Sequence, residues 1–579
     1  MRRSALTWSA ACLSLALLAA EAWAAPQAAP AEPRPAPGMQ RRALREQDLT
    51  QAVAEGRAAL AGGRLPEARA AFERAAEIDR AGPESSFWLS RLAIAEGEHE
   101  SVLGKLSRLR REGKAGPDEA YLQALSLEAL AGEALARGAS GVGLMLEDAF
   151  NALEPVSKAE NERYGDAHLP LARVARQLGR HPAGEAAARR ALAVDPKSVE
   201  ATGLLGRALL GQVAGLSNSE ADAARRAALC AEAISAFESG LALLGNEPGE
   251  PSQRQAAAEL CYQLGNAHAF DRDLERAESA YGRAIGFDPG LVDFGALRGA
   301  LGNARFAAAC REGSTQFVAR YGADDPRDAT TQWWLGFVLW SEGQPDQRAN
   351  AKAAFETALA KYPAYLNSLY YLTQLAYDEQ QYEAASAYLL DYFQRSADGL
   401  AQMLTDDRDL LRIEFLVGQA VDGQRLDRAA GLTRVLCAAR PETSRFWNNL
   451  GLFLRDDGDR RMAKLTADDP AEAERAEIQA LWEASLEAYE RALALEPKNP
   501  AYLNDTAVIL HYNLRRDFER ALALYAEATL EATRLLEAGG LDPETKDIVQ
   551  IALRDSKNNR RTLERQLEKA KQPPAPAGG

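Results

Sequence analysis

The chain has 579 residues, a formal net charge of −15 at pH 7 and 47% hydrophobic residues. A protein this acidic repels phosphate backbones, which excludes nucleic acid as a partner. The apolar content is ample for a continuous core, and charged residues at 26% indicate a well-solvated surface.

Residues 1–24 are typical of a cleaved export signal. Arg2-Arg3 forms the basic start, Ala10 to Ala20 is an apolar run, and Ala22-Trp23-Ala24 gives the A-x-A cleavage pattern. The run is too short for a transmembrane span, which needs about 20 residues. We expect Ala25 to begin the mature chain and a periplasmic or secreted location, through the general or the twin-arginine route. Most of the apolar run follows Cys12, which disfavours a lipoprotein anchor.

Proline and alanine dominate the next segment, residues 25–44, and proline returns in the closing segment, residues 572–579. Proline lacks a backbone donor and favours an extended chain, so the first segment is predicted to be a linker. The second is predicted to be a disordered tail.

The best-formed periodic segment runs from Cys261 to Pro289. It reads Cys261-x2-Leu264-Gly265-x2-His268, followed by Ala277-x3-Tyr281-x2-Ala284-x4-Pro289. Small and large apolar residues at these spacings are where two antiparallel helices would touch. The same frame returns, in whole or in part, from near residue 49 to near residue 538, and no stretch shows strand alternation.

This spacing resembles the tetratricopeptide repeat family, whose unit of about 34 residues carries the pattern W-x2-L-G-x2-Y, A-x3-F and P. The resemblance implies an all-α, right-handed superhelical solenoid of antiparallel helix pairs, with a capping helix at its C-terminal end. The expected parts are divergent N-terminal repeats, two blocks of regular repeats and the cap, at residues 45–163 (divergent after 82), 164–325, 326–540 and 541–571.

Three details of the frame are open to test. One repeat has its glycine at 451 where the regular frame requires position 473, so an insertion is expected near 456–478. A shorter insertion is expected after Gly206, where the frame requires position 213, and Gly418 is expected to pair with Ala430 and Cys437. In the cap, the apolar stripe expected to face inward contains Ile548, Ile551, Ala552, Leu563 and Leu567.

No set of residues predicts an active site. The five histidines lie outside any zinc-binding spacing, and no nucleophile elbow or phosphate loop occurs. We therefore expect a non-catalytic protein without a metal or a cofactor. Cys230 and Cys261 lie on helices that should be adjacent, and they either form a disulfide or remain separate core thiols.

The family resemblance also implies where a ligand would bind. The first helix of each unit lines a concave groove, with ligand-facing side chains about three to four residues apart. Transferred to this chain, that frame gives the groove residues Trp333, Phe337, Trp340, Tyr370, Gln374, Tyr377, Phe415, Asn448 and Asn504. Aromatic rings bury much ligand area, and asparagine offers a donor and an acceptor to a peptide backbone.

We therefore expect a scaffold that binds a protein or peptide segment in this groove, as part of a bacterial envelope complex. The alternative is a carbohydrate-handling subunit of an envelope polysaccharide export machine, because aromatic platforms also stack on sugar faces. An enzyme with a hidden site is the third possibility.

Overall fold

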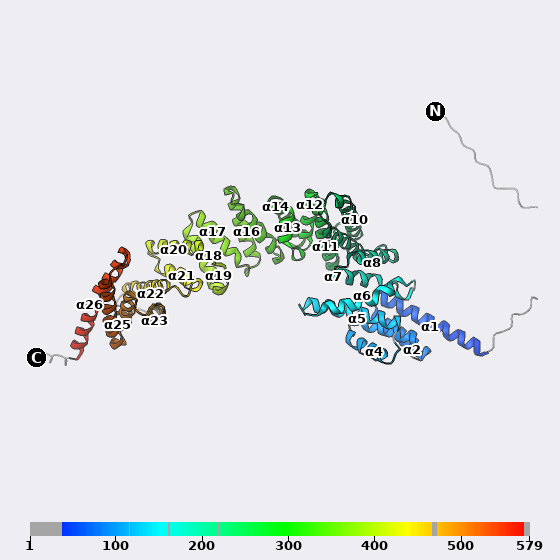
Figure 1. Ribbon diagram of the computed structural model, residues 1–579, viewed down its shortest axis with the longest axis horizontal. Coiled ribbons are helices and arrows are strands. Elements are labelled where there is room, and N and C mark those ends of the chain that lie inside the picture. Colours follow the sequence, from blue (N-terminus) through cyan, green and yellow to red (C-terminus); the bar gives the residue numbers. More distant parts are fainter. Residues whose placement is uncertain are drawn as a thin grey trace, which may run out of the picture. The chain divides into compact units, whose positions relative to one another are not determined.

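The structure is a computed structural model that describes residues 37–80, 82–114, 116–159, 162–217, 219–465 and 472–571. The predicted signal peptide, most of the linker and the tail at 572–579 lie outside these ranges. Within them the regular structure is entirely helical, without a strand, and the predicted all-α architecture of helix pairs is confirmed. The chain divides into two compact units, residues 1–190 and 191–579 (Figure 1).

The first unit is built from consecutive helices joined by short turns. Helix α1 begins at Pro37, so residues 37–44 are helical rather than linker. Helix α8 crosses the division between the units. The helices are α1 (Pro37–Ala61), α2 (Leu65–Asp79), α3 (Pro83–Ala95), α4 (His99–Arg111), α5 (Pro117–Ala136), α6 (Val142–Lys158), η1 (Glu162–Tyr164), α7 (His168–Gln177) and α8 (His181–Val194).

The second unit continues the same succession of hairpins. Its helices are α9 (Val199–Ala214), α10 (Glu220–Leu244), α11 (Pro251–Phe270), α12 (Leu274–Phe287), η2 (Pro289–Leu291), α13 (Phe294–Leu301), α14 (Asn303–Tyr321), η3 (Pro326–Asp328), α15 (Ala329–Ser341), η4 (Pro345–Gln347), α16 (Arg348–Lys361), α17 (Asn367–Asp378), α18 (Tyr382–Arg395), α19 (Ala397–Met403), α20 (Asp407–Asp422), α21 (Leu426–Ala439), α22 (Ser444–Lys464), α23 (Glu472–Leu495), α24 (Pro500–Val508), η5 (Ile509–Leu514), α25 (Phe518–Ala538) and α26 (Pro543–Lys571).

Local chemistry fixes many of the helix starts. The Asp273 side chain accepts a hydrogen bond from the backbone N–H of Arg276 at the start of α12, and Ser198 does the same for α9. Helices α11 and α24 have proline in the first turn, where its missing N–H leaves no bond unmade. These local signals mark the boundaries of the hairpins.

A glycine facing an aromatic ring marks the crossing of many hairpins. A Cβ added to Gly265 would lie 2.5 Å from two atoms of the Tyr281 ring, and one added to Gly451 would lie 2.6 Å from the Tyr489 ring. The same relation joins Gly56 to Phe72, Gly206 to Phe237, and Gly336 to Phe355. The ring occupies the space that a side chain would need, so the two helix backbones approach closely.

The crossings also locate the insertions. If Phe237 followed its glycine by as many residues along the chain as Tyr281 follows Gly265, that glycine would be at position 221. The glycine that meets Phe237 is Gly206, so this insertion is longer than predicted and the expected position 213 is wrong. The insertion near 456–478 lengthens both helices of its hairpin, α22 to 21 residues and α23 to 24. Gly458 and the Trp482 ring form a second close contact inside the lengthened part.

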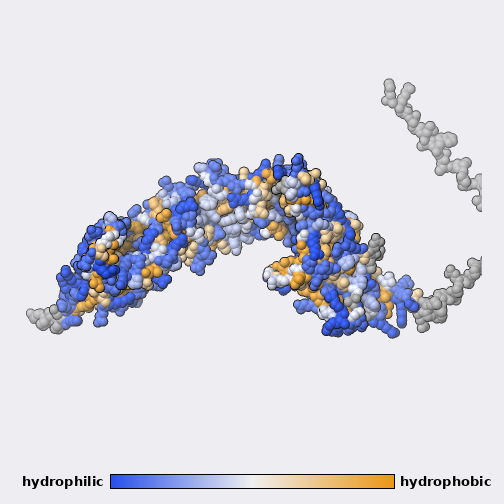
Figure 2. Space-filling model, in the orientation of Figure 1, coloured by the Kyte–Doolittle hydropathy of each residue, from blue (hydrophilic) through white to orange (hydrophobic). Residues whose placement is uncertain are grey.

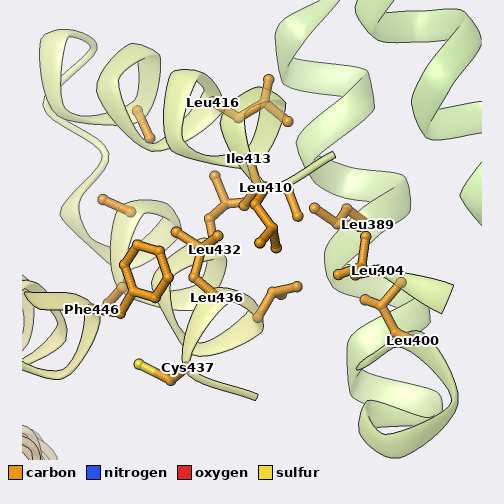
Figure 3. Packing of buried hydrophobic residues seen from close by; sticks show 14 of the residues in the cluster. Leu389, Leu400, Leu404, Leu410, Ile413, Leu416, Leu432, Leu436, Cys437 and Phe446 are labelled. Atoms are coloured by element: carbon orange, nitrogen blue, oxygen red, sulfur yellow. The ribbon is translucent and has the colours of Figure 1, made fainter. Parts of the chain in front are cut away.

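The predicted register of one repeat is also wrong. Gly418 is exposed, and no atom lies within 4 Å of an added Cβ there, so it does not mark a crossing. The buried face of α20 is instead formed by Leu410, Ile413, Leu416 and Ala420. Figure 3 shows three of these residues packed with leucines of α18, α19 and α21 and with Phe446.

Polar residues cover most of the face visible in Figure 2. Among the described helices, α10 alone is long and apolar enough to cross a membrane by length and composition. That is weak evidence for a span, because core helices share these properties. In α10 the residues Cys230, Ala233, Phe237 and Gly240 are buried.

The last helix buries only part of the predicted stripe. Ala552 and Leu563 are buried as predicted and Leu567 packs against the core, but Val549 and Ser556 complete the buried face, whereas Ile548 and Ile551 are 49% and 50% exposed. The π-helical turn η5 presents His511 and Tyr512 to α26. There His511 bonds Gln566 over 3.1 Å, and the Tyr512 hydroxyl donates to Asn559 over 3.0 Å. Polar contacts therefore supplement a thin apolar contact.

Candidate functional site

The three predicted aromatic residues of α15 form one group. The Trp333 and Phe337 rings stack with centroids 5.4 Å apart, and Phe337 lies 6.1 Å from Trp340. Tyr371 of α17 adds its ring 4.8 Å from Trp340 and stacks on Phe355 of α16 at 5.1 Å. All three predicted rings contact Tyr371 and so bridge α15 and α17 of neighbouring helix pairs. They are half-buried, which leaves part of each ring surface exposed.

Two predicted groove residues of α17 are tied to a buried carboxylate. The Tyr370 hydroxyl donates to Asp409 over 2.7 Å, and the Gln374 amide donates to the same carboxylate over 3.2 Å. Arg412 in turn donates to the Gln374 carbonyl oxygen. Burial raises the pKa of Tyr370, and the hydrogen bond to Asp409 raises it further as the second largest cause. Gln374 is only 5% exposed, so in this conformation it joins α17 to α20 and offers little surface to a ligand.

The predicted residues Tyr377 and Phe415 form a second aromatic contact, between α17 and α20. Their centroids are 5.8 Å apart, and Tyr382 of α18 lies 5.0 Å from Phe415. Phe415 is 41% exposed, the largest exposure among the predicted aromatic residues. It is therefore the predicted ring most open to a partner.

The predicted asparagines meet at a carboxylate that the sequence analysis did not select. Asn448 of α22 and Asn504 of α24 each donate from Nδ2 to Asp505 over 3.3 Å. Burial raises the pKa of Asp505. Among the described residues, the Oδ1 atoms of both asparagines have no hydrogen-bond donor. The structure thus brings these two predicted residues together, far from the aromatic group on α15 in the sequence.

Asn448 also lines a groove of about 820 Å³ between α22, α24, α25 and α26, here called the terminal groove. Its apolar wall includes Leu535, Ile548 and Val549, and its polar wall includes Asn448 and Asn449. A volume of this order fits small ligands or a few side chains of a peptide. Sequence reasoning found only Asn448 among the residues of this groove. The apolar Ile548 was the other residue that could have indicated it, but the sequence analysis assigned Ile548 to the buried stripe of the last helix, and the structure leaves it half-exposed.

Residues with metal-binding or redox potential are dispersed. Within the described ranges, no group of three or more histidine, cysteine or acidic side chains is arranged to hold a metal ion. Cys230, Cys261, Cys310 and Cys437 are free and buried. Burial raises the pKa of Cys230 and Cys261 to about 11, so these thiols carry little thiolate at neutral pH.

The chain was compared with known families and proteins. Two models described as tetratricopeptide repeat match it, one at residues 53–117 and 169–215, the other at 258–290. The first match extends beyond residue 82, into the segment where the repeat spacing is poor. No curated protein matches the chain.

Solved structures of low sequence identity resemble it. The Cut9–Hcn1 hetero-tetramer of APC/C has a chain with 15% identity, covering 89% of this chain and 98% of that chain, with a TM-score of 0.26. TTC0263, a TPR protein of Thermus thermophilus, has 18% identity over 43% of this chain and 96% of its own, with a TM-score of 0.25. PilF of Pseudomonas aeruginosa has 17% identity over 51% and 98%, with a TM-score of 0.23.

At such TM-scores these likenesses carry no argument about function. The family matches instead coincide with helix hairpins whose crossings were described above, since Gly56, Gly206 and Gly265 lie within the matched segments. Residues 53–117, 169–215 and 258–290 of this all-α chain therefore match the tetratricopeptide repeat, and the glycine and ring crossings of their hairpins agree with that match.

Proposed function

We propose that this protein is a non-catalytic scaffold that binds protein segments on the surfaces formed by the first helices of its repeats and in the terminal groove. Tetratricopeptide repeats are protein-interaction modules, which supports the general role. The terminal groove is the observation that carries the proposal. Its aliphatic wall can take a side chain, and beside Asn448 the exposed Asn449 lines it with an amide group suited to a peptide backbone.

The half-buried aromatic rings of α15, α17 and α20 support the same role. Phe415 and Tyr377 present ring surface beside one another, and such rings bury large areas at low entropic cost. A partner segment lying along these helices would contact successive repeats, which suits an extended peptide better than a compact small molecule.

The experiment places a photo-crosslinking amino acid at single positions of the full chain in cells. Crosslinks to protein are expected at Phe415 and Ile548, which lie on the proposed binding surfaces. Leu243 of α10 and Leu530 of α25 are also exposed, but they neither line the terminal groove nor lie on the first helix of a repeat, so they serve as controls. Equal crosslinking at all four positions, or none at Phe415 and Ile548, would refute the proposal.

We further propose that the scaffold works in a bacterial envelope, either periplasmic or secreted. The support is the signal-like sequence of residues 1–24. Cell fractionation followed by N-terminal sequencing tests it, with Ala25 expected as the first residue of the exported chain. A cytoplasmic protein that retains Met1 would contradict the location while leaving the binding role open.

A carbohydrate-handling role in polysaccharide export is the second candidate. The exposed face of Phe415 beside Tyr377 favours it, because sugar rings stack on such faces. Titrating the tryptophan fluorescence with envelope polysaccharides and with peptides separates the two roles. Saturable quenching by polysaccharide alone would favour carbohydrate binding over the scaffold. A hydrolase screen of the purified protein tests the non-catalytic proposal, and turnover of any substrate would overturn it.

A further inference from the structure

The end of the last helix differs from the rest of the chain in its charge. Residues 554–571, the final turns of α26, contain seven basic and three acidic side chains, whereas the whole chain has a net charge of −15. Four of these cations are exposed and follow one another at intervals of four residues. This row, here called the basic stripe, consists of Lys557, Arg561, Arg565 and Lys569.

The basic stripe faces away from the core. Arg565 follows the buried Ser556 by nine residues, which is two and a half helical turns, so the two side chains lie on opposite faces of α26. Figure 1 shows α26 as the outermost helix at its end of the second unit. The stripe is therefore open to a large surface as well as to a small ligand.

The neighbouring acids do not neutralise the basic stripe. Asp555 pairs with Arg554, and Glu564 pairs with Arg560, each over 2.9 Å. Within the described ranges, no carboxylate forms an ion pair with any of the four stripe cations. The final turns of α26 therefore present uncompensated positive charge.

This arrangement is unfavourable for the helix by itself. Like charges four residues apart destabilise a helix, and the basic stripe contains three such pairs. Elsewhere the chain uses the same spacing for opposite charges, as in the pair of Arg461 with Asp457 at 2.8 Å. The helix dipole favours cations only in the last turn, which includes Lys569 but not Arg561. Contact with an anionic surface would relieve this repulsion.

We propose that the basic stripe docks on the surface of an anionic lipid bilayer, with α26 lying parallel to the membrane plane. The ammonium and guanidinium groups donate to the phosphate oxygens of the lipid headgroups, and each cation near such a surface adds to the binding energy. The inference goes beyond the scaffold role and does not depend on it, because the stripe lies outside the terminal groove and away from Phe415 in the sequence.

The shape and composition of the stripe suit a lipid surface better than a protein partner. Successive cations are about 6 Å apart along the helix axis, so the row extends over about 18 Å of a convex surface. Stable protein interfaces have buried aromatic or aliphatic anchors at their centre. Residues 554–571 contain no aromatic side chain, and both leucines in the last three turns face the core. Charge is therefore the main feature by which this surface can be recognised.

The acidity of the rest of the chain does not prevent this contact. At physiological ionic strength, exposed charges are screened beyond about 8 Å. The outward-facing stripe of an outermost helix meets the membrane first, while acidic side chains on other helices of the unit lie behind it (Figure 1). Local charge then dominates the encounter.

The test measures co-sedimentation of the protein with lipid vesicles. It uses the chain from Ala25 onwards, the form expected after export, because the apolar run of residues 10–20 would itself bind lipid. Binding is expected to vesicles of phosphatidylglycerol and phosphatidylcholine in equal parts, but not to vesicles of phosphatidylcholine alone. Raising the salt to about 1 M, where the screening length is about 3 Å, should release the protein.

Two variants with the same net charge locate the effect. Replacing the four stripe cations by glutamine should lower the partition coefficient onto the mixed vesicles by about 100-fold or more. The control replaces four exposed arginines on other helices by glutamine and should bind like the natural chain. These control positions are Arg45, Arg225, Arg311 and Arg434. Because the stripe repels itself, its variant should unfold at a temperature no lower than that of the natural chain at low salt.

Absent binding, equal binding to the two kinds of vesicle, or an equal loss in the two variants would overturn the inference. Tighter binding of polyglutamate or of duplex DNA through the same four residues, measured by fluorescence polarisation, would also overturn it, because the ligand would then be a protein segment or a nucleic acid. None of these results bears on the scaffold proposal, which the crosslinks at Phe415 and Ile548 test separately.

Discussion

Gly265→Ala and Gly418→Ala should change stability in opposite directions, although both place alanine in a helix. An alanine Cβ at 265 would lie 2.5 Å from the Tyr281 ring, whereas carbon atoms in contact prefer about 3.5 to 4.0 Å. Tyr281 is 1% exposed, and its hydroxyl donates to Asn266 over 2.7 Å, so the ring cannot easily retreat. At 418 the added methyl group meets no atom within 4 Å.

The magnitudes follow from two competing effects. Alanine is favoured over glycine by about 1 kcal/mol in a helix interior. Overpacking a well-packed core costs about 1 to 3 kcal/mol. Because the required shift at 265 is large and the ring is held at both ends, we expect Gly265→Ala to lose about 1 to 2 kcal/mol net. Gly418→Ala should gain up to about 1 kcal/mol.

Local thiol alkylation measures both effects without assuming that the chain unfolds in one step. Cys261 lies on the same helix as Gly265, and Cys437 lies on α21, which packs against α20. The thiols are 0% and 2% exposed, and burial raises the pKa of Cys437 to about 12, so alkylation requires local opening. Mass spectrometry after a reagent pulse gives the rate at each thiol.

Gly265→Ala should speed alkylation of Cys261 by about 5- to 30-fold. Gly418→Ala should slow alkylation of Cys437 by up to about fivefold and leave Cys261 unchanged. Changes of the same sign at the two sites, or no change at Cys261, would refute the role assigned to the glycine and ring pairs.

The remaining predictions concern buried charge and the binding surfaces. Lys361→Met leaves the fully buried Asp328, 3.2 Å away, without its cation and should cost about 3 to 5 kcal/mol in chemical denaturation, with Lys352→Met as a near-neutral control. Burial raises the pKa of Asp505 in the folded chain, so this carboxyl group progressively destabilises the fold as the pH rises from its unfolded-state pKa to its folded-state pKa; Asp505→Asn should therefore be at least as stable as the natural chain at neutral pH and should lack part of its stabilisation on acidification, as followed by thermal unfolding. Trp333→Ala with Trp340→Ala should abolish partner binding with helicity retained, but both rings contact Tyr371, so we also expect a lower unfolding temperature. Phe415→Ala, at a more exposed ring, should weaken partner capture with little loss of stability, and unchanged capture would argue against this surface.

The hairpins were predictable where one spacing encodes one contact. Gly265 and Tyr281 stand at the separation that two antiparallel helices impose, so the sequence indicates their meeting directly. Gly418 has the right residue type at the predicted position but faces no ring. A glycine alone therefore does not reveal the register, because the partner on the second helix decides it.

The last helix shows why periodicity can leave a face undetermined. Ile548, Val549, Ile551 and Ala552 are all apolar, and they supply two overlapping stripes at helical spacing. Contacts with α24 and α25 select the stripe through Val549, Ala552 and Leu563. Only the tertiary packing leaves Ile548 open to the groove.

The terminal groove escaped sequence reasoning for a related reason. Its walls come from α22, α24, α25 and α26, so its residues lie as far apart as Arg445 and Val549 in the chain. No short motif joins them. Asp505 was overlooked because an aspartate within a helix usually faces solvent, and only the asparagines packed against it reveal its burial.

The glycine and ring crossings have a consequence for how such a chain can grow. In the hairpin of α22 and α23, the first helix continues from Gly451 to Lys464, whereas α11 ends at Phe270, soon after Gly265. At about 1.5 Å per residue, this difference places the end of α22 roughly 12 Å farther from its crossing. The contact between the glycine and the ring stays in place, and the parts of the two helices beyond it can be longer without altering that contact. Foreign sequences inserted at the far end of this hairpin should therefore be tolerated, which makes it a suitable attachment point for a reporter or an additional module.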